Sequence, residues 1–198
     1  MTPLRGGNRS VRSSGALAVA AAAAVLALTG AVGTAQARQI GNFDVGGAIE
    51  AEYDRAGGFA AFGNPVSPET DAGAGGKFQA FERNTSIYWS VGTDAHAVGG
   101  QIRDKWGALG WENGALGYPV TDEEKAGRDG QGRYNLFNGG TVYWSPKTGA
   151  HAVWGKIRET WAAEVAEKGR YGYPTGDEYD YQGGKAQDFQ GGRITWKP

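Results

Sequence analysis

One glutamate recurs at the same place in three similar segments of the chain, four residues after the proline of a G-x-P string. These glutamates are Glu69, Glu123 and Glu178, and Asp122 and Asp177 precede two of them. A glycoside hydrolase needs two carboxylates, roughly 5–10 Å apart, that differ in pKa. One acid per segment does not match that asymmetry. We therefore expect these glutamates to form salt bridges or to accept hydrogen bonds from turn N–H groups, with acceptance from sugar hydroxyls as the functional alternative.

A basic residue recurs in the same segments, directly after a glycine and at the start of a predicted strand. The three residues are Lys77, Arg133 and Lys185. Charged side chains at such positions often do no more than keep an edge strand soluble. They can also donate hydrogen bonds to the hydroxyl groups or phosphates of a polymer, and this is the function we consider for them.

Aromatic residues divide between the two faces of the predicted strands. In "SIYWS" and "TVYWS", the tryptophan shares a face with isoleucine or valine, and the tyrosine lies on the opposite face. The tryptophans of the strands and of the predicted helices are expected in the core: Trp89, Trp106, Trp144, Trp161 and Trp196. We expect Tyr88 and Tyr143 to be exposed, where their rings can stack on sugars.

The two histidines, His96 and His151, occupy the same position of two segments, within the string "AHAV". A catalytic histidine needs its own nucleophile and orienting group, and the chain contains no cysteine. The sequence also lacks the H-E-x-x-H or paired-histidine spacing of a metal site. We expect hydrogen-bonded structural histidines, with no catalytic residue, no metal site and no cofactor.

Three landmarks establish an internal repeat of about 54 residues. The glycines of the G-x-P strings, Gly63, Gly117 and Gly172, follow one another at intervals of 54 and 55 residues. The two strand tryptophans and the two histidines are also 55 residues apart. The predicted repeats are residues 46–98, 99–153 and 154–198.

Each repeat begins with a predicted helix and ends with a predicted β-hairpin. In "GQIRDKWGALG", Ile102, Trp106 and Leu109 follow at spacings of four and three residues, which places them on one face of a helix. A G-x-P turn follows, and then two alternating strands that are joined at "FNGG" in the second repeat. The fold class is therefore α+β: three tandem helix and β-hairpin repeats packed into one compact repeat domain, either a propeller-like ring or a short solenoid.

Residues 1–37 have the organisation of a secretory signal peptide, with three arginines, an Ala-rich apolar run and an A-x-A site that predicts cleavage after Ala37. A retained membrane anchor is the alternative. Removing the three arginines leaves 17 basic and 21 acidic residues in segment 38–198, so we expect no nucleic-acid partner. We also expect no membrane span after cleavage of the signal. Without cysteine, the secreted domain must be stabilised by its core alone.

The segment "GQGRYNLFNGGTVYWSPKTGAHAVWGKI", with the preceding "LGYP" and "TDEE", resembles the LGFP repeat. The resemblance covers essentially all of segment 38–198, although the first copy reads "FGNP" and the third ends in "TWKP" instead of "YWSP". Such repeats occur in secreted proteins of actinobacteria, often beside mycolyltransferases, amidases or other envelope enzymes. The resemblance implies a non-catalytic module that holds proteins to the cell wall, through arabinogalactan.

We therefore expect a secreted, non-enzymatic module of the cell envelope that binds a cell-wall polysaccharide through repeated weak sites. The candidate ligand-binding residues are Tyr88, Tyr143, Arg133, Lys77, Lys185, Glu69, Glu123 and Glu178. A hydrolase of glycan or peptidoglycan remains an alternative, and it requires Glu123 and a second acid in one cleft, with one pKa raised. A structural module that recruits envelope enzymes is the other alternative, and large exposed apolar patches would favour it.

Overall fold

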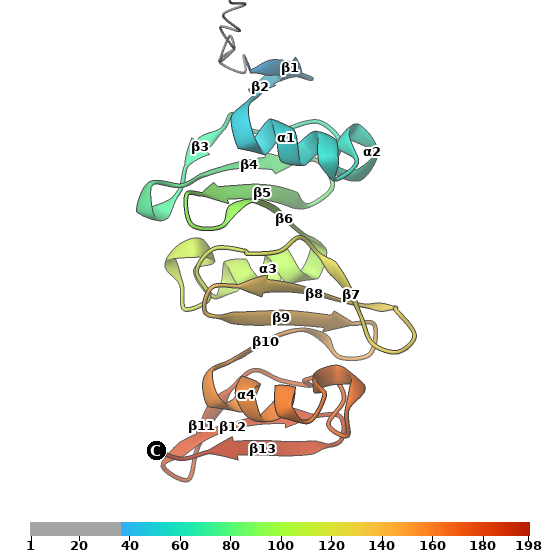
Figure 1. Ribbon diagram of the computed structural model, residues 1–198, viewed down its shortest axis with the longest axis vertical. Helices are drawn as coiled ribbons and strands as arrows, with labels where there is room; N and C mark the ends of the chain where they lie inside the picture. Colours follow the sequence, from blue (N-terminus) through green and yellow to red (C-terminus); the bar gives the residue numbers. More distant parts are fainter. Residues whose placement is uncertain (1–36) are drawn as a thin grey trace, which may run out of the picture. The chain divides into compact units, whose positions relative to one another are not determined.

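The computed structural model describes residues 37–198, which belong to one compact unit (Figure 1). The predicted signal peptide lies outside the described residues, except for Ala37. Within the described part of the chain, the helices are all too short or too polar to cross a bilayer.

The three repeats share a helix, a short strand and a β-hairpin in the same order, and the first two repeats add a further strand. The first repeat follows a short hairpin of β1 (Arg38–Ile40) and β2 (Phe43–Val45), and comprises α1 (Gly47–Arg55), α2 (Gly58–Phe62), β3 (Thr70–Asp71), β4 (Lys77–Phe81), β5 (Thr85–Ser90) and β6 (Asp94–Gly99). The second comprises α3 (Gly100–Ala108), β7 (Glu124–Ala126), β8 (Gly132–Phe137), β9 (Gly140–Ser145) and β10 (Gly149–Trp154). The third comprises α4 (Gly155–Ala163), β11 (Tyr179–Tyr181), β12 (Gly184–Phe189) and β13 (Gly192–Trp196). Short 3₁₀ turns lie at Gly73–Gly75, Trp111–Asn113 and Ala166–Lys168.

Each repeat contributes one small antiparallel sheet, and none of the sheets described in residues 37–198 closes into a barrel. The strand orders are β3-β4-β5-β6, β10-β9-β8-β7 and β11-β12-β13. The predicted hairpins are confirmed as the pairs β4–β5, β8–β9 and β12–β13. The prediction of a hairpin alone was incomplete, because the "AHAV" strings form a further strand and short strands β3, β7 and β11 add another edge.

The helices confirm the predicted apolar face and explain the G-x-P glycines. Trp106 and Trp161 are 0% and 1% exposed, and each indole Nε1–H donates to a glycine carbonyl, at 3.1 Å to Gly117 and to Gly172. In the first repeat Tyr53 replaces the tryptophan, and its hydroxyl donates to the Gly63 carbonyl at 3.0 Å. The three glycines have φ values of +73°, +66° and +64°, which L side chains rarely adopt. The turn is therefore held to the helix by one repeated hydrogen bond.

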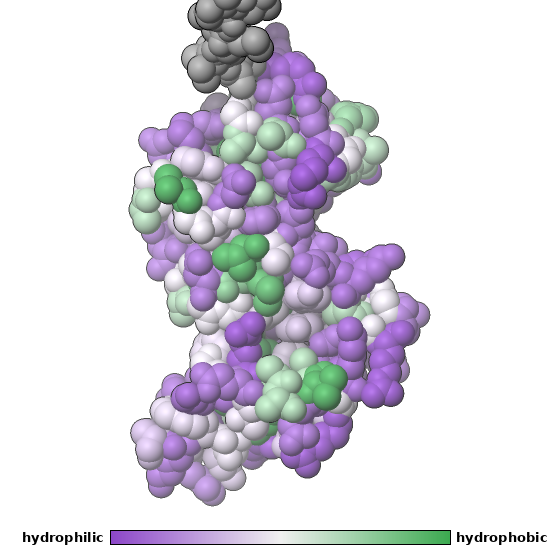
Figure 2. All heavy atoms as spheres, in the orientation of Figure 1, coloured by the Kyte–Doolittle hydropathy of each residue, from purple (hydrophilic) through white to green (hydrophobic). Residues whose placement is uncertain are grey.

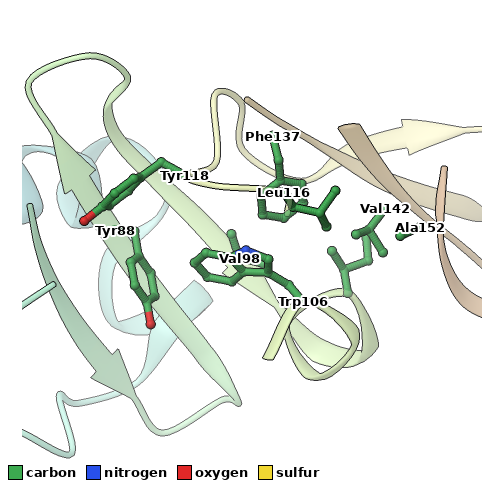
Figure 3. Close-up of a cluster of buried hydrophobic side chains, with 9 residues drawn as sticks. Tyr88, Val98, Trp106, Leu116, Tyr118, Phe137, Val142 and Ala152 are labelled. Atoms are coloured by element: carbon green, nitrogen blue, oxygen red, sulfur yellow. The ribbon is translucent and has the colours of Figure 1, made fainter. Parts of the chain in front are cut away.

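Both faces of the first two sheets are covered. Ile87 on β5 packs with Ile49 of α1 in its own repeat, whereas Tyr88 packs on Trp106 of the next repeat, with ring centroids 4.6 Å apart (Figure 3). Tyr143 meets Trp161 in the same way at 4.9 Å. The prediction that the tyrosine face is exposed is therefore wrong: Tyr88 is 4% exposed and Tyr143 is half-buried. The physical reason is that each following helix packs against the preceding sheet.

The β1–β2 hairpin before the first repeat occupies the place of the last strand of a preceding repeat. Val45 on β2 holds the position that Val98 and Val153 hold at the ends of β6 and β10, and all three are fully buried. The β1–β2 hairpin therefore covers the start of α1 as a preceding repeat would.

The third sheet has a different outer face. Thr195 stands where the other sheets carry a tyrosine, and beside it Arg193 forms an ion pair with Asp188 at 2.7 Å. The guanidinium of Arg193 also lies over the rings of Tyr179 and Tyr181, at 5.6 and 5.0 Å from their centroids. Charged and phenolic groups thus cover this face, as is common for the terminal unit of a repeat domain.

Candidate binding pockets and the joints between repeats

Strand register brings a basic residue and a tryptophan together in every repeat. The directly opposite pairs are Lys77 and Trp89, Arg133 and Trp144, and Lys185 and Trp196. Side chains that oppose each other in an antiparallel pair point to the same face of the sheet. Each pair lines a cavity, with volumes of about 950, 620 and 370 Å³ from the first repeat to the third.

A carboxylate completes each of these three pockets. Glu69 lies 2.7 Å from the Lys77 Nζ, and its hydrogen bond raises the pKa of that lysine. Glu123 lies 3.4 Å from the Arg133 Nε, and burial raises the pKa of this glutamate. In the third repeat the partner is Asp180, 2.5 Å from the Lys185 Nζ.

The structure therefore brings together five of the predicted binding residues: Lys77, Arg133, Lys185, Glu69 and Glu123. Glu178 does not line the third pocket, where Asp180 stands instead. The expectation of a salt bridge at the recurring glutamate is confirmed in the first two repeats. Tyr88 and Tyr143 line none of the three pockets, because they face the neighbouring helix.

The strand tryptophans were predicted to lie in the core, but not all of them do. Trp89 and Trp144 are half-buried, and each packs at the margin of a core cluster. Trp196 is 39% exposed, so the prediction is wrong there. These residues lie near the end of the strand, beyond the side chains that the helix covers, and alternation alone does not reveal this position.

The three pockets have different walls. The first two are also lined by the start of a helix, at Gly47 and Gly100 respectively. The first pocket alone has an additional wall from the β1–β2 hairpin, which contributes Gln39 and Asn42. This wall accounts for its larger volume and gives it further side-chain amides.

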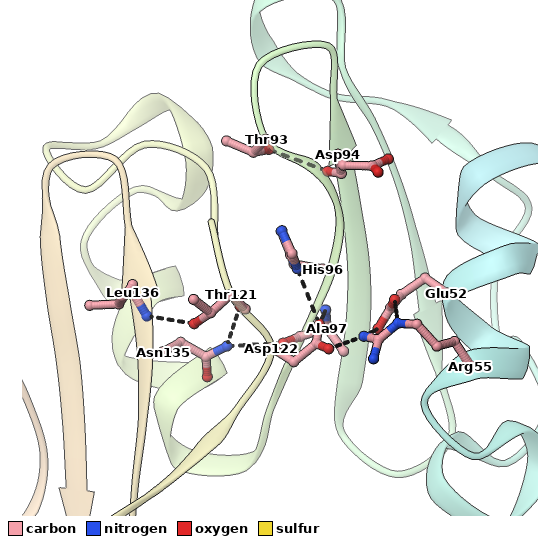
Figure 4. Close-up of polar contacts among 10 residues, drawn as sticks. All are labelled: Glu52, Arg55, Thr93, Asp94, His96, Ala97, Thr121, Asp122, Asn135 and Leu136. Carbon is pink, nitrogen blue, oxygen red and sulfur yellow. Dashed lines mark hydrogen bonds and ion pairs between the residues drawn. The ribbon is translucent and has the colours of Figure 1, made fainter.

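A second recurring cluster joins consecutive repeats, and we call it a joint. At the first joint, one carboxylate oxygen of Asp122 accepts from the Ala97 backbone N–H at 3.1 Å and lies 3.3 Å from the His96 Nδ1 (Figure 4). At the second joint, Asp177 makes the same two contacts with Ala152 and His151, both at 3.3 Å. The predicted structural role of the two histidines is confirmed, since both are hydrogen-bonded in these joints.

Sequence reasoning missed a buried amide that lies under each joint. The side-chain NH₂ of Asn135 donates to the carbonyls of Ala97 and Thr121, both at 3.0 Å, and so bridges the first repeat to the second. Gln187 bridges the second repeat to the third in the same way, and Gln79 connects the first repeat to Asp44 of the β1–β2 hairpin. All three amides are fully buried. The available signal was a polar residue in the apolar phase of "KFQAF", "RYNLF" and "KAQDF".

The first joint contains additional charges. Glu52 of α1 is 5% exposed and accepts two hydrogen bonds from Arg55, each at 2.8 Å, while Arg55 also donates to Asp122. Burial, with the nearby Asp122 carboxylate, raises the pKa of Glu52 to about 7 against the opposing effect of Arg55. Burial also opposes ionisation of Asp122, but the Ala97 N–H and Arg55 outweigh it and lower the pKa of this group.

The second joint has a lysine where the first has Glu52. The Lys105 Nζ lies 2.7 Å from Asp177. Partial burial of Asp177 opposes its ionisation, but the hydrogen bonds from His151 and Lys105 lower its pKa to about 2. The two joints therefore share their backbone contact and differ in net charge.

In residues 37–198, no cluster of three or more His, Asp or Glu side chains has a geometry that could hold a metal ion. The face shown in Figure 2 is mostly hydrophilic, with small, separate hydrophobic patches. In the described part of the chain, the exposed large apolar residues are spread along the sequence: Phe59, Val66, Val91, Val165 and Trp196.

The family model described as the LGFP repeat matches three segments, residues 62–114, 116–169 and 172–198. Each match starts at a G-x-P turn, so the first two matches each contain one sheet and the helix of the next repeat, and each joint lies between two consecutive matches. LGFP repeats are typical of cell-surface proteins. No curated protein matches the chain.

Proposed function

The chain belongs to the LGFP repeat family, and on this premise we propose that it is a secreted, non-catalytic module that binds a polysaccharide of the cell envelope. The observation that carries the proposal is the recurrence of a tryptophan, a cation and a carboxylate in one pocket per repeat. Arabinogalactan is the polymer we propose, with the cell wall as the location. In this proposal the module requires no cofactor, and envelope enzymes are its protein partners.

The chemistry of these pockets suits a sugar. A sugar ring has an apolar C–H face that can lie on an indole, while its hydroxyl groups can both donate and accept hydrogen bonds. Lys77 and Glu69 beside Trp89 supply one donor group and one acceptor group to such hydroxyls. The half-buried state of the indole fixes its orientation and leaves part of the ring accessible.

Binding through several pockets of one chain raises the overall affinity for a repetitive polymer. Each small pocket binds weakly by itself, but the first contact raises the effective concentration of the next sugar at the neighbouring pocket. We expect an avidity gain on the order of 10²-fold when two or three pockets engage one polymer.

The repeats form an open series in this proposal, not a closed ring. The β1–β2 hairpin covers the start of the first repeat, and the Arg193–Asp188 pair with its two tyrosines covers the last sheet. Because both outer faces are already covered, neither offers the other an apolar surface to close a ring.

The test is co-sedimentation of the purified secreted form with insoluble cell wall. A triple variant with Trp89→Ala, Trp144→Ala and Trp196→Ala should remain in the supernatant, whereas the wild type should pellet. The control triple Phe59→Ala, Val91→Ala and Val165→Ala removes exposed apolar side chains outside the pockets and should pellet as the wild type does. Failure of the wild type to pellet, or equal pelleting of both triples, would contradict the proposal.

A glycan hydrolase is the second candidate function, and one observation favours it. Glu52 and Asp122 line one cavity of about 690 Å³ at the first joint, and their pKa values are shifted in opposite directions. Such divergence is typical of an acid and base pair. We prefer binding, because Arg55 occupies both oxygens of Glu52. Release of reducing ends from arabinogalactan, abolished by Glu52→Gln, would instead establish the hydrolase.

A further inference from the structure

The cation of each binding pocket already has an anionic partner inside the pocket. The distances are 2.7 Å from Lys77 to Glu69, 3.4 Å from Arg133 to Glu123 and 2.5 Å from Lys185 to Asp180. Each pocket therefore presents a tryptophan beside a charge-matched pair, in place of a free positive charge.

We propose that these carboxylates set the ligand class, so that the pockets accept uncharged polyhydroxyl glycans and reject polymers that carry phosphate or uronate groups. This inference rests on the proposed function and specifies which polysaccharides the same sites take. A neutral sugar hydroxyl can bridge the pair, because it donates to the carboxylate and accepts from the cation. An anionic group would have to displace the carboxylate or remain beside it against charge repulsion.

The third repeat provides independent support for this assignment. Its glutamate at the recurring position, Glu178, does not line the pocket, and the carboxylate comes from Asp180 on β11 instead. The pair is thus retained although its acid comes from a different position in the repeat. This indicates that pairing is a property of the pocket and not merely of the repeated sequence.

In the second pocket the cation is held in place by backbone carbonyls as well as by its carboxylate. The Arg133 Nη1 donates to the carbonyls of Gly130 and Gly132, at 2.8 and 2.7 Å, while its Nε faces Glu123. Two backbone carbonyls therefore accept from one nitrogen of the guanidinium, and a carboxylate lies beside another. An anionic ligand gains little from such a group, whereas a hydroxyl can insert beside it.

The inference is tested by a charge-matched pair of triple variants. The pocket triple Glu69→Gln, Glu123→Gln and Asp180→Asn removes the nearest carboxylate of each cation and keeps similar side-chain volumes, while Asp71 remains 3.9 Å from Lys77. The control triple Asp54→Asn, Glu159→Gln and Glu164→Gln removes the same charge from surface ion pairs with Arg38, Lys156 and Arg170, which lie outside the pockets. Circular dichroism and thermal unfolding verify that both triples fold.

Affinity electrophoresis in gels that contain either neutral arabinogalactan or anionic polygalacturonate, at fixed ionic strength, measures the ligand class. The wild type should be retarded by the neutral polymer only. The pocket triple should lose about fivefold or more in affinity for arabinogalactan and gain retardation by polygalacturonate, while the control triple should behave as the wild type. A repetition with wall teichoic acid extends the test to phosphate.

Each outcome bears on a different part of the account. If the wild type binds the anionic polymer as tightly as the neutral one, or if both triples change equally, the inference is overturned while the binding function stands. If neither polymer retards the wild type, the proposed function fails, and the inference fails with it. If the pocket triple binds arabinogalactan unchanged, the carboxylates do not set the ligand class.

Discussion

The two joints of this chain have the same backbone contact and different electrostatics. In both, an aspartate of the following repeat accepts a hydrogen bond from the "AHAV" strand of the preceding one. The first joint places the carboxylates of Glu52 and Asp122 around Arg55, whereas the second places Asp177 alone beside Lys105. The repeated fold therefore fixes where the repeats meet, while the helix residues Glu52 and Arg55, in place of Lys105 and Ala108, give the first joint different charges from the second.

The first copy of the repeat lacks this aspartate. Pro68 stands at the position of Asp122 and Asp177, and no histidine precedes it in the β1–β2 hairpin. A joint requires both partners, and the chain has two histidines for two joints.

The largest expected effect concerns the two helix tryptophans, which pack between consecutive sheets near the joints. Trp106→Ala and Trp161→Ala should each lower the free energy of unfolding by about 3–5 kcal/mol, because each leaves a cavity between two sheets. Urea unfolding followed by circular dichroism measures both. If one variant lowers the free energy of unfolding several times as much as the other, the apolar contacts beside the two joints are not equivalent, and the two joints do not differ in electrostatics alone.

A smaller and unequal effect is expected from the two aspartates. Asp177→Ala should cost about 2–3 kcal/mol at pH 7.5, because it leaves the Ala152 N–H and Lys105 without their acceptor. Asp122→Ala should cost about 1 kcal/mol, because the same loss is offset by relief of the repulsion with Glu52. The same urea titration supplies both values. Equal costs would show that the charge difference between the joints has no energetic consequence.

The pH dependence of the free energy of unfolding distinguishes the first joint from the second. The pKa of Glu52 is raised to about 7, so its contribution to stability is complete below its ordinary value and is lost as the pH rises through about 7. Wild-type stability should therefore fall between pH 5 and pH 8 by on the order of 1–3 kcal/mol more than that of Glu52→Gln. Asp122 and Asp177, with lowered pKa values, have the opposite sign and lose their contributions only in stronger acid.

The groups that face Glu52 define the controls for this titration. They are Arg55 on the same helix, Asp94 and His96 from β6, and Asp122, Glu123 and Glu124 from the following repeat. The exposed Glu159 of α4 provides a matched variant, Glu159→Gln, which should keep the wild-type slope. A slope that persists in Glu52→Gln would assign the pH response to another group.

The smallest expected effect comes from transplanting the second joint into the first. The double variant Glu52→Lys and Arg55→Ala reproduces the residues at the equivalent positions, Lys105 and Ala108. It should raise stability at pH 8 by about 0.5–1 kcal/mol and flatten the profile above pH 5. Differential scanning fluorimetry at pH 5 and pH 8 is sufficient. A double variant that keeps the wild-type slope would contradict the electrostatic explanation.

Much of the fold was predictable because each repeat contains its own local signals. The 55-residue spacing, the Ile102 and Trp106 face and the "FNGG" turn predicted the repeats, the helices and the central hairpins. Alternation also separated the two faces of each strand correctly. What alternation could not show is that the next helix covers the tyrosine face, because that contact lies between residues of different repeats.

The candidate site was predictable in part for the same reason. The recurring cations and glutamates were identified from their positions, and the structure unites five of them in pockets. Their aromatic partner was assigned wrongly, since strand parity groups Trp89 with Ile87 but does not show that the helix covers only the isoleucine fully. Asp180 replaces Glu178 as the partner of the cation, because β11 places Asp180 directly opposite Lys185, as β3 places Asp71 opposite Lys77.

The most direct test of the account follows the indole N–H signals of the seven tryptophans by NMR while an arabinogalactan oligosaccharide is added. The account predicts that the signals of Trp89, Trp144 and Trp196 shift with saturation, and that those of the buried Trp106 and Trp161 do not. Shifts confined to the other tryptophans, or no shifts at concentrations where the wild type is retained by the polymer, would contradict it.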